Sequence, residues 1–122
     1  VKRQPTSTPM QALVLLNDPQ FTEASRLIAT RMLLEGGESA EQRIRFAFRL
    51  ATSRFPETKE LRVLLDMLQE ELADFEAEPV AAEKLIAVGE SPVGLDLDPL
   101  ELAAYTVTAN AILNLTEAVR KG

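Results

Sequence analysis

The chain has 122 residues, of which 46% are hydrophobic and 26% are charged, and it contains neither cysteine nor histidine. This composition is typical of one globular domain and argues against a disordered or a membrane-embedded chain. The lack of both residue types also excludes disulfide bonds, hydrolytic triads and histidine-ligated haem. A net charge of −6 argues against a nucleic-acid-binding protein, which needs a basic surface.

The first predicted helix covers about residues 9–16 and begins with a capping box. Thr8 and Gln11 are spaced so that each side chain can accept a hydrogen bond from the other residue's backbone amide. Pro9 occupies the first helical position, where proline is favoured. Because a helix of about two turns is not stable alone in water, we expect it to be buried at the centre of the fold. Residues 1–7 are expected to be a flexible lead from an upstream region.

Further helices are expected wherever apolar residues recur with three-four spacing between a capping residue and a proline or glycine. Asp18 and Pro19 repeat the cap-and-proline signal of the first helix, and Ser39 and Asp98 begin two more capping boxes. The predicted ranges are about 19–35, 39–53, 58–75, 79–88 and 98–113, with a loop over 89–97 and a short amphipathic helix over 116–120.

No segment alternates with a period of two, so no strand is expected. The sequence predicts an all-α fold, a compact array of about six helices plus a short C-terminal helix without a sheet. Residues 8–122 are expected to form a single domain. The longest apolar stretch, residues 100–115, is interrupted by polar residues and is shorter than the ~18–20 apolar residues of a membrane-spanning helix, so it predicts a core helix.

Three asparagines lie beside apolar runs in the first and the last long helix. Buried amides need hydrogen-bond partners, so we expect them to bond to helix ends and to fix how these two helices pack. Together with the helix caps they form the predicted structural motif, which comprises Thr8, Gln11, Asn17, Asp18, Asn110 and Asn114.

Charge is distributed unevenly along the chain. Residues 1–62 carry ten Lys and Arg against seven Asp and Glu, whereas residues 63–122 carry three against twelve. One interpretation is ion pairing within the molecule between a basic segment, residues 43–62, and an acidic segment, residues 66–90. The second is a docking face for an acidic partner or for the upstream part of the same polypeptide, and a third is an anionic ligand. The candidate docking residues are Arg43, Arg45, Arg49 and Arg54.

Glu70, Asp74 and Glu78 recur at every fourth position, with Glu71 beside them. A helical stripe of carboxylates is normally a solvated face, because calcium sites usually also need loop carbonyls. We therefore predict no metal site, with a cation on this stripe as the alternative. Glycoside hydrolysis by paired carboxylates would need sugar-stacking aromatic residues, and the chain has no Trp and one Tyr.

No catalytic residue and no cofactor are predicted either. The chain contains three methionines, the remaining candidates for haem ligands. All three lie on apolar helix faces, and we expect them to pack in the core. They are Met10, Met32 and Met67.

Several segments, taken in their order along the chain, resemble one bacterial family. Residues 8–21 read Thr-Pro-Met-Gln-Ala-Leu-Val-Leu-Leu-Asn-Asp-Pro-Gln-Phe, and they are joined by the segments 45–51, 87–92, 98–105 and 109–117. Together these resemble the C-terminal part of domain-of-unknown-function family 1553, best known from planctomycetes. The chain departs from the family at Glu57, where Thr or Ser is usual, and at Thr116, where Asp is common.

The resemblance implies no activity. It implies the end of a long exported protein, periplasmic or on the cell surface, that often carries cytochrome-c-like segments upstream. The chain does not begin with Met, which agrees with a part of a longer protein.

We therefore expect a non-catalytic helical C-terminal domain that acts in intramolecular packing or protein–protein docking. Its partner would be the upstream domains of the same polypeptide or another protein, without nucleic acid and without membrane insertion, and its oligomeric state stays open. The alternative is an accessory ligand-binding or enzymatic domain, for carbohydrate or redox processing, whose site upstream domains complete. A concave pocket with converging polar groups would favour the alternative, and an apolar surface patch would favour docking.

Overall fold

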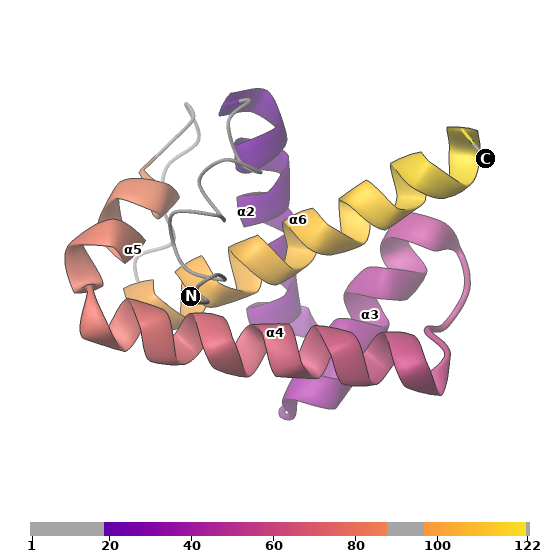
Figure 1. Cartoon of the computed structure of the whole chain (residues 1–122), viewed down its shortest axis with the longest axis horizontal. Helices are drawn as coiled ribbons and strands as arrows, with labels where there is room; N and C mark the ends of the chain where they lie inside the picture. Colours follow the sequence, from indigo (N-terminus) through magenta and orange to yellow (C-terminus); the bar gives the residue numbers. More distant parts are fainter. Residues whose placement is uncertain (1–18, 88–96, 122) are drawn as a thin grey trace, which may run out of the picture.

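The computed structural model describes residues 19–87 and 97–121, and in these ranges it contains helices and no strand. The predicted all-α fold is confirmed. The helices, shown in Figure 1, are α2 (Pro19–Glu35), α3 (Ala40–Thr52), α4 (Thr58–Ala77), α5 (Pro79–Ile86) and α6 (Pro99–Lys121).

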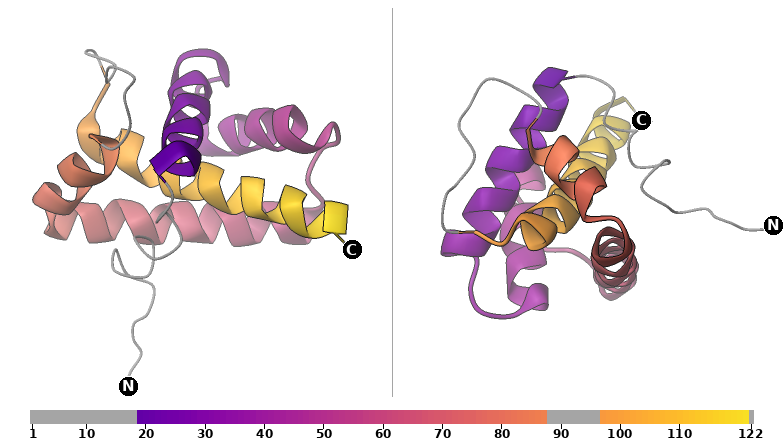
Figure 2. Two further views of the ribbon diagram at one scale, coloured as in Figure 1. Left: turned by 90° about the horizontal axis from the view of Figure 1, so that it is seen from above. Right: turned by 90° about the vertical axis from the view of Figure 1, so that its left-hand side faces the viewer.

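Helix α6 is the centre of the described structure. All residues from Leu102 to Asn110 are buried, and α6 contacts each of the other four helices. Helix α4 runs alongside α6, α2 crosses α6 steeply, and α5 and α3 lie at opposite ends of α4 (Figures 1 and 2). Three buried alanines on α6 allow its neighbours to approach closely. They are Ala103, Ala104 and Ala109.

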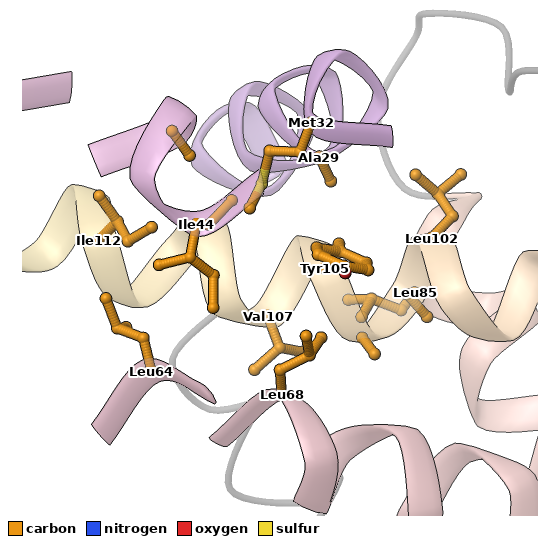
Figure 3. Close-up of a cluster of buried hydrophobic side chains, with 14 of the residues drawn as sticks. Ala29, Met32, Ile44, Leu64, Leu68, Leu85, Leu102, Tyr105, Val107 and Ile112 are labelled. Atoms are coloured by element: carbon orange, nitrogen blue, oxygen red, sulfur yellow. The ribbon is translucent and has the colours of Figure 1, made fainter. Parts of the chain in front are cut away.

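One hydrophobic cluster draws residues from all five helices. Figure 3 shows Met32 of α2 on one side of α6 and Leu64 and Leu68 of α4 on the other. Met32 is fully buried and Met67 is half-buried against the cluster, in agreement with their expected packing in the core.

Capping side chains accept hydrogen bonds from backbone amides at the starts of α3 and α6, and the predicted capping box is confirmed at Ser39. Ser39 and Gln42 form the expected capping box, in which the Gln42 amide donates to Ser39 Oγ and the Ser39 amide donates to Gln42 Oε1, both over 3.1 Å. At α6, the Leu100 amide donates to the Asp98 carboxylate over 3.0 Å. Helix α3 ends at Ser53, which adopts the left-handed conformation with φ 67°.

The predicted number of helices is slightly off. A separate helix over residues 116–120 is wrong, because α6 continues to Lys121 and the sequence after Pro99 has no proline or glycine before Gly122 to stop it. The predicted first helix lies outside the described residues, as do the lead over 1–7 and nearly all of the loop over 89–97. The same holds for the motif residues Thr8, Gln11, Asn17 and Asp18.

The two remaining motif residues connect α6 to α2. Asn110 is buried and its Nδ2 donates to Ser25 Oγ of α2 over 3.2 Å, while Asn114 Nδ2 donates to Asn110 Oδ1 over 3.0 Å. These bonds give a direct side-chain connection between α6 and α2.

Replacing Asn110 by alanine is expected to lower the free energy of unfolding by about 1–3 kcal/mol, because buried groups lose a partner. Urea denaturation of Asn110→Ala beside Asn114→Ala measures this difference. Asn114 is exposed, so its loss removes only the outer bond and the cost is expected to be smaller. A larger loss for Asn114→Ala would contradict the structural role of Asn110.

Candidate functional site

The four candidate arginines do not share one surface, because two of them bind other residues of the domain. Arg43 Nε donates to the Gly37 carbonyl oxygen over 3.0 Å, and its Nη1 donates to the Tyr105 hydroxyl over 3.2 Å. Its Nη1 also lies 3.8 Å from Glu101 Oε2. Arg43 therefore joins α3 to the central helix.

Arg54 joins the end of α3 to the start of α4. Its two terminal nitrogens donate to the two carboxylate oxygens of Glu60, each over 2.9 Å. Its guanidinium carbon lies 4.8 Å from the centre of the Phe48 ring. The hydrogen bonds from Arg54 hold the pKa of Glu60 below its usual range. This bidentate geometry fixes the connection between the two helices.

Arg45 and Arg49 instead border a groove of about 600 Å³ on the surface of α3. Apolar side chains line most of this groove, and Leu50 and Phe55 are 44% and 54% exposed. We call it the α3 groove; its lining residues are Gly36, Gln42, Arg45, Phe46, Arg49, Leu50 and Phe55.

Helix periodicity explains why α3 has both a core face and a groove face. Ile44, Ala47 and Phe48 are buried on the side of the core. The groove residues of α3 follow their own three-four spacing on the other side of the helix. They are Gln42, Arg45, Phe46, Arg49 and Leu50.

Gly36 leaves one end of the groove open. A Cβ atom at this position would lie 2.6 Å from the Met32 carbonyl oxygen, which is too close for any side chain without a backbone shift. The turn between α2 and α3 therefore requires glycine here, and the groove gains space as a consequence.

Arginine side chains lie over both aromatic rings of the groove. The guanidinium of Arg49 lies 5.2 Å from the centre of the Phe55 ring, and that of Arg31, on α2, lies 5.5 Å from the centre of the Phe46 ring. Such stacking orders the cations at the groove edge. Arg45 pairs with Glu41 over 3.1 Å, whereas Arg49 has no carboxylate partner among the described residues.

The interpretation that the basic segment pairs with the acidic segment is contradicted. Each ion pair of the described arginines uses an acid outside residues 66–87, namely Glu23, Glu35, Glu101, Glu41 or Glu60. Among the described residues, the ion pairs of the basic segment therefore use Glu41, Glu60 and Glu101, and none of them reaches residues 66–87.

The predicted solvated carboxylate stripe is wrong for Glu71 and in part for Asp74. Glu70 and Glu78 are exposed, but Glu71 is only 5% exposed and Asp74 is half-buried. Glu71 occupies a core position of α4, where its neighbours on the buried stripe are Leu68 and Phe75. The buried face of α4 therefore includes position 71, which the sequence analysis assigned to the solvated face.

Burial changes the acidity of both side chains. Burial, reinforced by the charges of Asp74 and Glu70, raises the pKa of Glu71 to about 7. Burial and the charge of Glu78 also raise the pKa of Asp74. Glu71 Oε1 and Asp74 Oδ2 are buried without a hydrogen-bond partner. Within the described ranges, no group of three or more Asp or Glu side chains is arranged to hold a metal ion.

Sequence reasoning missed Arg26, which is 2% exposed and among the largest fully buried side chains. Its Nη1 donates to the carbonyl oxygen of Ile86, the last residue of α5, over 3.1 Å. Its Nη2 lies 3.9 Å from Glu23 Oε2. Arg26 thus connects α2 to the C-terminal end of α5, where a positive charge is favoured.

Comparison with known proteins places the chain in a family. A family model described as "PSD1: Protein of unknown function (DUF1553)" matches residues 1–68, more than half of the chain, including α2, α3 and the whole α3 groove. Neither a curated protein nor a solved structure matches the chain significantly. No helix in the described part combines the length and apolar character needed to span a membrane. The chain therefore belongs to the PSD1 family of proteins of unknown function (DUF1553).

Proposed function

We propose that this chain is a non-catalytic docking domain that binds a protein segment in the α3 groove. The observation that carries this proposal is an apolar groove of about 600 Å³ that remains open on the surface of an otherwise well-packed helical array. Large contiguous apolar patches on the surface of folded domains often mark binding sites. The role would belong to a single domain, residues 8–122, that closes a larger exported protein, as the family resemblance suggests.

The chemistry of the groove supports docking over catalysis. Its polar side chains are Gln42 and two arginines, and a guanidinium group is a hydrogen-bond donor without an acceptor atom. Among the described residues, its lining contains no carboxylate, hydroxyl or amine that could act as a nucleophile or a general base. The lining therefore favours a bound apolar segment over a reacting substrate.

The partner that best suits this role is the upstream region of the same polypeptide, with another protein as the alternative. The test is binding of the separately expressed upstream region to the domain, measured by surface plasmon resonance. The double variant Leu50→Ser, Phe55→Ser is expected to weaken binding by about tenfold or more, because each buried apolar side chain contributes about 1.5–3 kcal/mol.

Val80→Ser is the control, since Val80 is also an exposed apolar residue and lies on α5, at the opposite end of α4 from α3. Circular dichroism checks that all variants remain folded. Equal binding by wild type, double variant and control would eliminate the groove as the docking site.

A further inference from the structure

The shape of the groove points to a helical occupant. Its lining on α3 spans two helical turns between Gln42 and Leu50, with ridges formed by residues four apart. Ridges of this kind pack against a second helix that places its own apolar residues between them. Peptides that bind by extending a sheet are not accommodated here, since the described ranges contain no strand.

The apolar surface extends from α3 onto α2. Leu27 and Leu34 are 46% and 67% exposed and lie one turn before and one turn after Arg31 on the same face of α2. Arg31 lies over the Phe46 ring of the groove, so it connects the exposed face of α2 to α3. An occupant could therefore contact both helices along a surface longer than the groove itself.

Three arginines lie at the edge of this surface. Arg31, Arg45 and Arg49 surround the apolar residues, and stacking over Phe46 and Phe55 holds two of them in place. Arg31 and Arg45 pair only with exposed glutamates on their own helices, and such pairs exchange easily for others. Arg49 has no carboxylate partner within the described residues. These three arginines can therefore form ion pairs with carboxylates of a bound partner.

From these observations we propose that the α3 groove binds an amphipathic helix of a partner chain whose apolar stripe is flanked by Asp or Glu. This inference rests on the proposed docking function and specifies the chemistry of the partner. The apolar stripe of the occupant packs on Phe46, Leu50 and Phe55. Its flanking carboxylates pair with Arg45 and Arg49, which set the orientation and the association rate.

The probes are three labelled synthetic helical peptides with leucines at three-four spacing, flanked by Glu, by Gln or by Lys. Fluorescence anisotropy with the whole chain measures their affinities at low and at high salt. The Glu peptide is expected to bind about tenfold or more tightly than the Gln peptide at low salt, and the Lys peptide most weakly. High salt is expected to reduce the difference between Glu and Gln peptides.

Charge reversal gives the sharpest test. Arg45→Glu with Arg49→Glu is expected to reverse the order, so that the Lys peptide binds more tightly than the Glu peptide. The control is Lys84→Glu, since Lys84 is exposed on α5, away from the groove, and its replacement also makes the chain more negative. This variant is expected to keep the wild-type order of peptide affinities.

The outcomes separate this inference from the proposed function. Equal binding of Glu and Gln peptides to the wild-type chain overturns the charge recognition while leaving apolar docking intact. Failure of all three peptides to bind overturns the helical occupant, and binding of the upstream region then decides the proposed function independently. Unchanged peptide binding by Leu50→Ser, Phe55→Ser shows that the peptides bind outside the groove and overturns this inference, while the proposed function still depends on binding of the upstream region.

Discussion

Replacing Glu71 by glutamine is expected to stabilise the domain by about 3 kcal/mol at a pH of about 8 and to change its stability little at a pH of about 4. The physical reason is the position of this carboxyl group on the buried stripe of α4, where burial raises its pKa to about 7. Glutamine resembles the protonated carboxyl in shape but carries no ionisable group.

The direction of the effect follows from proton binding in the two states. In the unfolded chain Glu71 loses its proton near the ordinary value of 4.5, whereas in the folded chain it keeps the proton to about 7. Between these two values only the unfolded state releases the proton, so rising pH favours unfolding. Above the folded-state pKa the loss is complete and stays constant, which gives the expected difference at alkaline pH.

Urea denaturation across this pH range measures the effect. Asp74 also has a raised pKa, so a smaller decline in the same direction is expected to remain in Glu71→Gln. The facing residues of α6 from Leu102 to Asn110 carry no Asp, Glu, Lys or Arg, and the ionisable groups of α5, Glu83 and Lys84, are exposed. Glu70→Gln on the exposed side is the matched control, with a change of about half a kcal/mol or less. A pH profile of Glu71→Gln parallel to that of wild type would show that Glu71 is solvated.

Local signals made the helices predictable, because caps and three-four spacing act within a few residues. The same spacing also places Glu71 next to the apolar stripe of α4. Leu61, Leu64 and Leu68 are followed at three-four spacing by both Glu71 and Leu72, and Leu72 is the apolar residue of the two. The structure places Glu71 in the core and Leu72 half-buried, since packing against α6 determines the exact rotation of α4.

The candidate docking face shows the same limit. Residues two apart on a helix point in opposite directions, so Arg43 and Arg45 could not have shared one face of α3. The separation of Arg43 from Arg45 could therefore be predicted from the sequence. The position of Phe55 over the groove could not, because it depends on the left-handed turn at Ser53 and on the bond between Arg54 and Glu60. Contacts that depend on how one helix is placed against the next have no counterpart in the spacing within a single helix.

The contact between Arg26 and Ile86, 60 residues apart, is the clearest example of a contact that local patterns do not predict. Replacing Arg26 is expected to have the second large effect on stability. Arg26→Ala should lower the free energy of unfolding by about 3–5 kcal/mol, because a large buried side chain and a buried charged hydrogen-bond donor are lost together. Arg31→Ala is the control, because Arg31 lies on the same helix but is exposed, with an ion pair to Glu35 and a contact to the Phe46 ring, and its loss should cost less than about 1 kcal/mol.

Arg26→Met separates the two contributions to this loss. Methionine fills much of the same volume but cannot donate to the Ile86 carbonyl, so its cost relative to wild type measures the hydrogen bond and the charge at the end of α5. We expect Arg26→Met to recover part of the loss in Arg26→Ala while α5 becomes less protected in amide hydrogen exchange. If Arg26→Met is as stable as wild type with unchanged protection of α5, the buried guanidinium acts only through its volume and does not anchor α5.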